Sequence, residues 1–184
     1  EYEPIRKALM EKYEGSPPAS EVISPPKKMQ RIVMKEKGAA RRDFGATHVK
    51  QLMAEDPRVI VLHGDLAGSG GFDAVEKEFP DRVINCGAAE ANMYMMASGL
   101  RQAGMLPITY TFAAFGTNEA RANARLIDIN SGHIPCSVLH DCTHTGLSVG
   151  EDGETHQARN YLNIPFDHTQ VWWTADSNQS AAVL

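Results

Sequence analysis

Residues 143–157 read Thr-His-Thr-Gly-Leu-Ser-Val-Gly-Glu-Asp-Gly-Glu-Thr-His-Gln, which places two histidines and an adjacent Glu-Asp pair among three glycines. Such a density of titratable groups and glycines is hard to explain as an ordinary surface loop. An apolar, strand-like run, residues 134–139, lies shortly before it. Open α/β sheets place their binding sites at the carboxyl ends of their strands. We therefore expect this segment, called here the histidine loop, to follow a strand of such a sheet and to form part of a binding site.

Length and composition set broad limits on the chain. Its 184 residues and 42% hydrophobic content fit one globular domain with its own core. No apolar run approaches the roughly 20 residues of a membrane span, so we expect no membrane partner. A net charge of −5 without a basic stripe argues against nucleic acid. Cys86, Cys136 and Cys142 form no Cys-x-x-Cys pair, so we expect reduced thiols in a cytoplasmic protein.

The beginning of the chain differs from the rest. Residues 4–14 have the pattern of one short helix, and the pairs Pro17-Pro18 and Pro25-Pro26 exclude regular structure around them. We therefore expect residues 1–38 to form a linker or strap with a short helix. Residues 39–184 are then one domain, truncated at its C-terminal end because the chain stops in what resembles the start of a helix.

Within that domain, short β-branched runs alternate with amphipathic ones. The expected strands are residues 59–62, 83–84, 106–110, 137–139 and 171–173. The expected helices are residues 40–54, 72–79, 89–102 and 118–129. Strands that alternate with helices are typical of a parallel sheet with helices on both faces. The predicted fold class is therefore α/β with a mostly parallel sheet.

Three further segments carry polar or aromatic groups near expected strand ends. The glycine-rich residues 63–71 are either a flexible turn or a loop that lets backbone approach a ligand. Glu90 begins an expected helix, where an acid either stabilises the helix dipole or faces a site. The aromatic residues 110–115 are either core or a wall for a flat heterocycle. The residues alone leave these alternatives open.

In chain order, these segments resemble the pyrimidine-binding domain of transketolase, a thiamine-diphosphate enzyme. The family's loop typically reads Thr-His-Asp-Ser-Ile-Gly-x-Gly-Glu-Asp-Gly-Pro-Thr-His-Gln, and residues 143–157 align with it without a gap. Further matches are Gly64-Asp65-Leu66 with Ser69, residues 87–93 with Gly-x-x-Glu-His-Ala-Met, and residues 111–115 with Thr-Phe-x-x-Phe. The resemblance covers about residues 41–184 and implies the thiamine-diphosphate-binding fold.

The resemblance implies which side chains hold the cofactor. Glu90 corresponds to a catalytic carboxylate that hydrogen-bonds the aminopyrimidine N1′ of thiamine diphosphate. A carboxylate there favours the imino tautomer, whose nitrogen can take the proton from thiazolium C2. Phe112 and Phe115 correspond to the aromatic pocket around the pyrimidine ring, and Asp65 to a loop acid beside the cofactor.

The resemblance also implies substrate contacts. His144 and His156 correspond to histidines that line the substrate channel, and both are candidate catalytic residues. Asp152 corresponds to an acid that recognises the C2 hydroxyl of a donor sugar, and Ser69 to a contact with substrate phosphate. Arg41, or the next residue, aligns with an arginine that binds acceptor phosphate. Sugar phosphates are therefore the implied substrates.

Some family features are replaced or missing. Ala91 stands where transketolases usually have His, and Thr145-Gly146 replaces Asp-Ser, so the identity of the sugars stays open. The family's diphosphate domain carries Gly-Asp-Gly and a later Asn, and no such motif occurs here. The resemblance thus implies that the Mg²⁺ ligands lie outside this chain and that no metal site lies within it. The implied partner is a second copy, as a homodimer, or a complementary diphosphate-binding domain or subunit.

Two other functions remain alternatives. One is another thiamine-diphosphate enzyme of the same architecture, such as a deoxyxylulose-phosphate synthase or the β-type component of a 2-oxo acid dehydrogenase. The other is a non-catalytic regulatory module. The histidine loop, with Gly-Glu-Asp-Gly-x-Thr-His-Gln preceded by Thr-His, favours transketolase, and the presence of Glu90 argues against a module without catalysis.

Overall fold

The computed structural model describes residues 40–145, 149 and 151–158, apart from the side chain of Arg41. All of them belong to one compact unit, Ile32–Leu184. The linker or strap predicted for residues 1–38 and the strand predicted at residues 171–173 lie outside the described residues.

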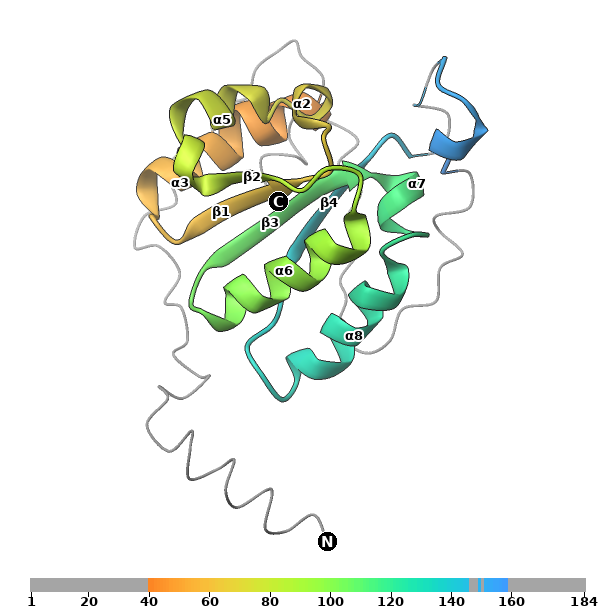
Figure 1. The fold of residues 1–184 in the computed structure, drawn as a ribbon. Coiled ribbons are helices and arrows are strands. Elements are labelled where there is room, and N and C mark those ends of the chain that lie inside the picture. The colour runs from red at the N-terminus through yellow and green to blue at the C-terminus, as the bar shows by residue number, and fades with distance from the viewer. Residues whose placement is uncertain (1–39, 146–148, 150, 159–184) are drawn as a thin grey trace, which may run out of the picture. The chain divides into compact units, whose positions relative to one another are not determined.

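A parallel sheet forms the centre of the fold (Figure 1). Its strands are β1 (Val59–His63), β2 (Val83–Asn85), β3 (Leu106–Phe112) and β4 (Leu139–Thr143). They lie in the order β2-β1-β3-β4, and every pairing is parallel. Since parallel strands all end at the same edge of a sheet, the segments that follow each of them meet there.

Helices connect the strands. Before β1, α2 (Ala40–Asp43), the π-helical turn η1 (Phe44–Val49) and α3 (Lys50–Glu55) form one continuous helix. The remaining helices are α4 (Ala67–Gly70), α5 (Asp73–Glu78), η2 (Pro80–Arg82), α6 (Glu90–Gln102), α7 (Ala113–Gly116), α8 (Arg121–Ser131) and η3 (Glu154–His156). Among the described residues, no helix has the length and apolar character that a membrane crossing requires.

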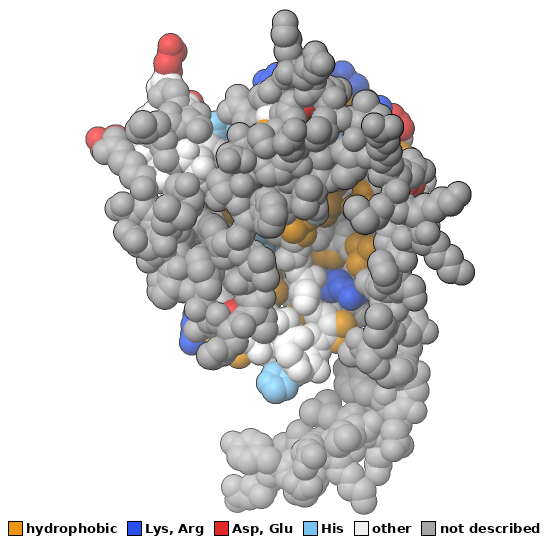
Figure 2. Space-filling model, turned by 180° about the vertical axis from the view of Figure 1, so that it is seen from behind, with side chains coloured by type: hydrophobic (Ala, Val, Ile, Leu, Met, Phe, Trp, Pro, Cys, Tyr) orange, Lys and Arg blue, Asp and Glu red, His pale blue; other side chains and the backbone are white. Residues whose placement is uncertain are grey.

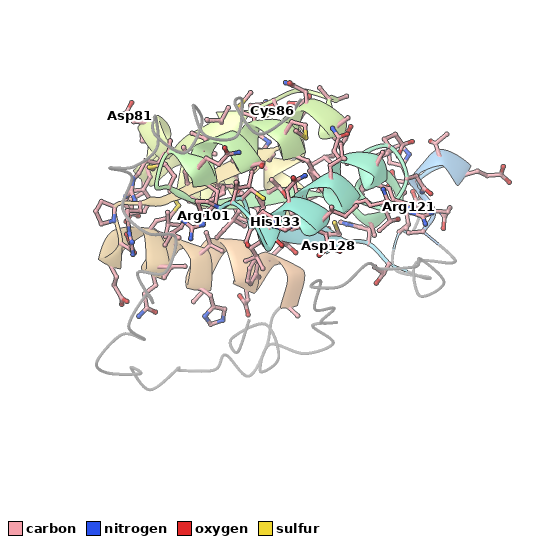
Figure 3. The ribbon with its side chains drawn as sticks, turned by 90° about the horizontal axis from the view of Figure 1, so that it is seen from below. Asp81, Cys86, Arg101, Arg121, Asp128 and His133 are labelled. Carbon is pink, nitrogen blue, oxygen red and sulfur yellow. The ribbon has the colours of Figure 1, made fainter. Side chains whose placement is uncertain are left out.

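Each face of the sheet has its own core. Val59 and Val61 of β1 pack with Phe44 and Phe72 beneath α3 and α5. Leu62, whose side chain points to the opposite face, packs instead with residues of α6 and α8. Figure 3 shows the α2–α3 helix on one side of the sheet and α6 with α8 on the other. The predicted parallel α/β sheet with helices on both faces is confirmed.

Most predicted elements are present, with one displaced strand. The predicted helix at residues 40–54 and the strands at residues 59–62, 83–84 and 106–110 match to within two residues. The strand predicted at residues 137–139 is wrong, because β4 starts at Leu139 and continues to Thr143. Pairing with β3 outweighs the polar composition of His140, Asp141 and Cys142, since it satisfies their backbone groups.

On the described part of the face in view in Figure 2, neither sign of charge dominates the surface. On the described part of that face, Lys and Arg side chains are scattered and do not gather in a stripe. Hydrophobic side chains lie between them.

Candidate active site

The loops at the carboxyl edge of the sheet carry most of the predicted site residues. Gly64 and Asp65 follow β1, Glu90 begins α6 after β2, Phe112 ends β3, and His144 follows β4. The shared edge, predicted from the alternation of strands and helices, therefore brings segments far apart in sequence into one region.

Glu90 is held in a buried position on this edge. Its side chain is 8% exposed, and Thr111 of β3 donates a hydrogen bond from Oγ1 to Oε1 over 3.3 Å. A β-carbon at Gly64 would lie 3.0 Å from the same oxygen, so glycine leaves the space that the carboxylate occupies. Because Glu90 is the first residue of α6, the helix dipole also favours its negative charge.

A short hydrogen-bonded chain joins the loops after β1 and β2. Asp65 adopts a left-handed backbone conformation, with φ of 63°. Its carboxylate accepts a hydrogen bond from Asn85 Nδ2 at 2.9 Å, and Asn85 Oδ1 accepts one from the Gly87 N–H at 2.9 Å. These bonds connect the loop after β1 to the turn at Gly87, shortly before Glu90. The Asp65 side chain remains exposed.

A hollow of about 610 Å³ opens beside this turn. Asp65 and Ser69 both line it, together with Asp73 and the guanidinium-bearing Arg42. The sequence leaves the choice between Arg41 and Arg42 open: Arg42 lines the hollow, whereas the side chain of Arg41 lies outside the described residues. Among the described residues, the lining therefore combines one cation, a hydroxyl and two carboxylates.

Four rings gather beyond the end of β3. The Phe112 and His144 rings are in contact, tilted by 32° with centroids 3.9 Å apart, and His156 lies edge-on to Phe112 at 6.0 Å and to Phe115 at 5.0 Å. A bridge between Thr145 and Ala158 closes the base of the histidine loop, which brings His144 and His156 to the same place. We call Phe112, Phe115, His144 and His156 the ring cluster.

The ring cluster leaves no space for a further ring between Phe112 and Phe115, so the two phenylalanines form a continuous apolar wall. The rings of Phe112 and Phe115 are nearly parallel, at 9°, with centroids 6.2 Å apart. Inserting a flat heterocycle between two rings requires about 7 Å, twice the contact distance of carbon atoms. A flat ring could therefore lie against this pair only from outside.

Asp152 is not brought into contact with these groups. It is exposed in the histidine loop, and its backbone carbonyl accepts a hydrogen bond from Gln157 Nε2 at 3.0 Å. It lines neither the hollow nor the ring cluster. Within the described part of the chain, no group of three or more His, Cys, Asp or Glu side chains is arranged to hold a metal ion.

Polar side chains continue behind Glu90 on the α6 face of the sheet. Tyr94 stacks on His140 with ring centroids 3.9 Å apart, and its hydroxyl lies 3.4 Å from Cys142 Sγ. Thr109 Oγ1 lies 2.7 Å from His140 Nδ1. Burial lowers the pKa of His140 to about 4 and raises the pKa of Cys142 to about 12. Both side chains are therefore neutral near pH 7, and the thiol is not a nucleophile.

His63 is a further buried titratable residue at the end of β1. It is 2% exposed, and neither ring nitrogen has a hydrogen-bond partner among the described residues. Burial lowers its pKa, while the charges of Glu76 and Asp65 oppose that effect. It lines neither the hollow nor the ring cluster.

Several site residues were not predicted from the sequence. Thr111 was noted only as part of an aromatic stretch, yet it is the donor to Glu90. Tyr110 lies 3.0 Å from Thr143, which in turn contacts His144. Asn85 holds Asp65. Alternation along β3 could have placed Thr109 and Thr111 together on one face, but nothing local identifies the residue that each contacts.

The parallel sheet with helices on both faces defines a doubly wound α/β domain. Such domains bind ligands at the carboxyl edge of the sheet, and this edge carries the buried carboxylate, the ring cluster and the polar hollow. Residues 37–184 match the family model described as transketolase, pyrimidine binding domain. The chain therefore belongs to this family.

Individual relatives agree with this assignment. Human transketolase is 37% identical over 125 residues, which cover 67% of this chain and 19% of that protein. A 1-deoxy-D-xylulose-5-phosphate synthase from Halalkalibacterium halodurans is 35% identical over 113 residues, covering 61% of this chain and 17% of that protein. A solved structure, a split gene transketolase described as an inactive beta4 tetramer, is 32% identical with a TM-score of 0.53 and covers 67% of this chain and 38% of its own. The chain thus spans well under half the length of these relatives.

Proposed function

We propose that this chain supplies the pyrimidine-binding half of a thiamine-diphosphate-dependent transketolase, which moves a two-carbon ketol unit from a ketose donor to an aldose acceptor. The observation that carries the proposal is the placement of Glu90. Glu90 is a nearly buried carboxylate at a helix start, with a hydrogen bond from Thr111 and a glycine beside it. No cation pairs with it among the described residues, which suits a carboxylate that meets a ligand, because buried charges are normally paired.

The described residues fit the cofactor's pyrimidine ring. Glu90 offers a carboxylate that can pair with a ring nitrogen, and the Phe112 and Phe115 pair offers an apolar wall on the same edge of the sheet. When bound, thiamine diphosphate supplies a thiazolium carbon that attacks the ketose carbonyl and carries the two-carbon unit. Glu90 would hold a proton shared with the pyrimidine N1′, and the ring wall would keep water away from that proton.

Other side chains suit sugar phosphates. Arg42 and Ser69 line one hollow, and a guanidinium with a hydroxyl is a suitable pair for phosphate oxygens. His144 and His156 would contact substrate oxygens from the ring cluster. Asp152 would accept a hydrogen bond from a donor hydroxyl, which requires the substrate or a partner to reach the exposed loop.

The proposal includes a partner. Since the chain spans only part of its relatives, the diphosphate group and its Mg²⁺ would be held by a complementary domain or subunit, or by a second copy in a homodimer. The split gene transketolase among the similar structures supports an arrangement of separate chains. A cytoplasmic setting, where sugar phosphates and reduced thiols occur together, belongs to the same proposal.

The experiment that tests this proposal is the substitution Glu90→Gln in the full-length protein with its partner. The variant keeps the shape and removes the charge, so ketol transfer should fall by about 10²-fold or more. Calorimetry should still detect cofactor binding, because the diphosphate contacts lie elsewhere. The matched control is Glu119→Gln, which changes an exposed carboxylate and should leave the rate unaltered. Near-normal transfer by Glu90→Gln would contradict the proposal.

A second candidate is a deoxyxylulose-phosphate synthase, favoured by the 35% identity to such an enzyme. Both reactions would use Glu90 in the same way and differ in the donor. Assays with a ketose phosphate and with pyruvate, each paired with an aldose phosphate, distinguish them. Activity with neither donor would instead favour a non-catalytic module.

A further inference from the structure

A buried chain of hydrogen bonds joins Tyr110 to His144. The Tyr110 hydroxyl lies 3.0 Å from Thr143 Oγ1, and Thr143 Oγ1 lies 2.8 Å from His144 Nδ1. Their exposed fractions are 0%, 9% and 8%. We call these three residues the tyrosine–histidine relay. Because it is shielded from water, its bonds polarise one another and favour one common direction.

The phenol sets the direction of the relay. A phenol is a better hydrogen-bond donor than an aliphatic hydroxyl, and a neutral imidazole nitrogen is a better acceptor than either oxygen. The most favourable order is therefore from Tyr110 to Thr143 and from Thr143 to His144 Nδ1. In that order Nδ1 accepts, and the ring proton of the neutral imidazole is on Nε2.

The fold makes room for this arrangement. A β-carbon at Gly70 would lie 2.5 Å from Tyr110 Cζ, so the glycine allows the phenol ring to lie under the loop that lines the hollow. Tyr110 also packs on Phe72 with ring centroids 4.8 Å apart, and His144 packs on Phe112 with centroids 3.9 Å apart. Both ends of the relay are thus fixed by packing on rings.

We propose that Tyr110 is a positioning residue that acts through Thr143 to hold His144 in the Nε2–H tautomer, so that His144 meets its substrate as a hydrogen-bond donor at Nε2. The relay itself is independent of any ligand, whereas its use toward substrate rests on the function proposed above. The group it would meet is an acceptor oxygen, such as that of a phosphate, a carbonyl or a hydroxyl.

The chain contains its own control for this inference. Thr155 Oγ1 lies 3.0 Å from His156 Nδ1, so the same Thr-His pair recurs in the histidine loop. Thr155 is exposed, whereas Thr143 is buried behind Tyr110. The tautomer ratio of His156 should therefore be governed by contact with water and should not depend on Tyr110.

The test uses the full-length protein labelled with ¹⁵N-histidine, without substrate, at about pH 8, where a histidine of ordinary pKa is neutral. Proton–nitrogen correlation spectra distinguish protonated from unprotonated ring nitrogens, and His144→Gln and His156→Gln assign the signals. The population of the Nε2–H tautomer of His144 should exceed that of the Nδ1–H tautomer by about tenfold or more. A tenfold ratio corresponds to the free energy of one net hydrogen bond. Tyr110→Phe should shift that ratio toward a mixture, while Thr143→Ser keeps it and the His156 signals do not change.

Two results would overturn the inference. One is a protonated Nδ1 on His144 in the unaltered protein, which needs no variant and decides the question even if Tyr110→Phe fails to fold. The other is an unchanged tautomer ratio in Tyr110→Phe. Failure of the proposed function would look different, since the enzyme would lack transferase activity while the His144 spectrum remained as expected. With activity present, Tyr110→Phe should raise KM for a phosphorylated substrate about tenfold and change kcat little.

Discussion

Thr111 and Glu90 meet inside the protein across 21 residues of sequence, with Thr111 Oγ1 donating to Glu90 Oε1 over 3.3 Å. Thr111 is 0% and Glu90 is 8% exposed, so water does not compete effectively for this bond. A buried hydrogen bond to a carboxylate restricts its orientation as well as its charge. Thr111 therefore sets the direction in which the Glu90 carboxylate points.

Removing the Thr111 hydroxyl should impair the function of Glu90. Thr111→Val should lower ketol transfer about tenfold or more, because an unsatisfied buried acceptor costs about 1–3 kcal/mol. Thr111→Ser should retain most activity. The control is Thr109→Val on the same face of β3, whose hydroxyl contacts His140 instead. The carboxylate infrared band that disappears in Glu90→Gln should shift in Thr111→Val only. Equal losses in the Val and Ser variants would refute the assignment.

Adding one methyl group at position 70 should destabilise the protein. In Gly70→Ala the new β-carbon would lie 2.5 Å from Tyr110 Cζ, and the packed ring has little room to move. Overpacking of this kind costs about 1–3 kcal/mol. Gly68→Ala in the same short helix meets nothing within 4 Å and should be neutral or slightly stabilising. Urea unfolding of the full-length variants measures both effects, and equal midpoints would contradict the prediction.

Asp141 should make stability depend on pH. Burial raises its pKa from 3.8 to about 7, and its Oδ2 has no hydrogen-bond partner among the described residues. In the unfolded chain the carboxyl ionises near its ordinary pKa, whereas in the folded protein it keeps its proton to about pH 7. The unfolded state therefore binds fewer protons across this interval, and the free energy of unfolding falls as pH rises.

Substituting an amide tests this directly. Asp141→Asn should be more stable than the parent at pH 7, by at most about 4 kcal/mol, and the difference should vanish near pH 4. Asp81→Asn changes an exposed carboxylate and serves as the control. Denaturant unfolding at several pH values provides the measurement. A difference that does not change with pH would show that ionisation of Asp141 is not its cause.

The hollow should discriminate phosphorylated from unphosphorylated substrates. Arg42→Gln should raise KM for a sugar phosphate about tenfold or more, because a charge-assisted hydrogen bond contributes about 1.5–3 kcal/mol. It should have little effect on the unphosphorylated analogue. Asp73→Asn removes a negative charge from the same hollow and should lower that KM. Arg41→Gln decides between the two arginines, and a larger effect there would return the role to Arg41.

The sequence by itself determined the class of fold and the place of the candidate site. The spacing of apolar residues predicted β1, β2, β3 and α6 close to their observed bounds. It could do so because the hydrophobic periodicity of a helix or strand is a local property of the sequence. The histidine loop and Glu90 were recognisable because the residue types and their spacing carry the family pattern. Their position at strand ends then followed from the parallel topology.

Only the tertiary structure decided which side chains meet. The run Leu-His-Asp-Cys-Thr of β4 has no apolar alternation, so pairing with β3 alone defines that strand and its register. That register brings Thr143 beside Tyr110, and the crossing of α6 over β3 brings Glu90 beside Thr111. Local periodicity specifies the face on which a side chain lies, but its partner depends on strand order and packing between distant segments. The relay to His144 and the support of Glu90 are therefore properties of the folded sheet.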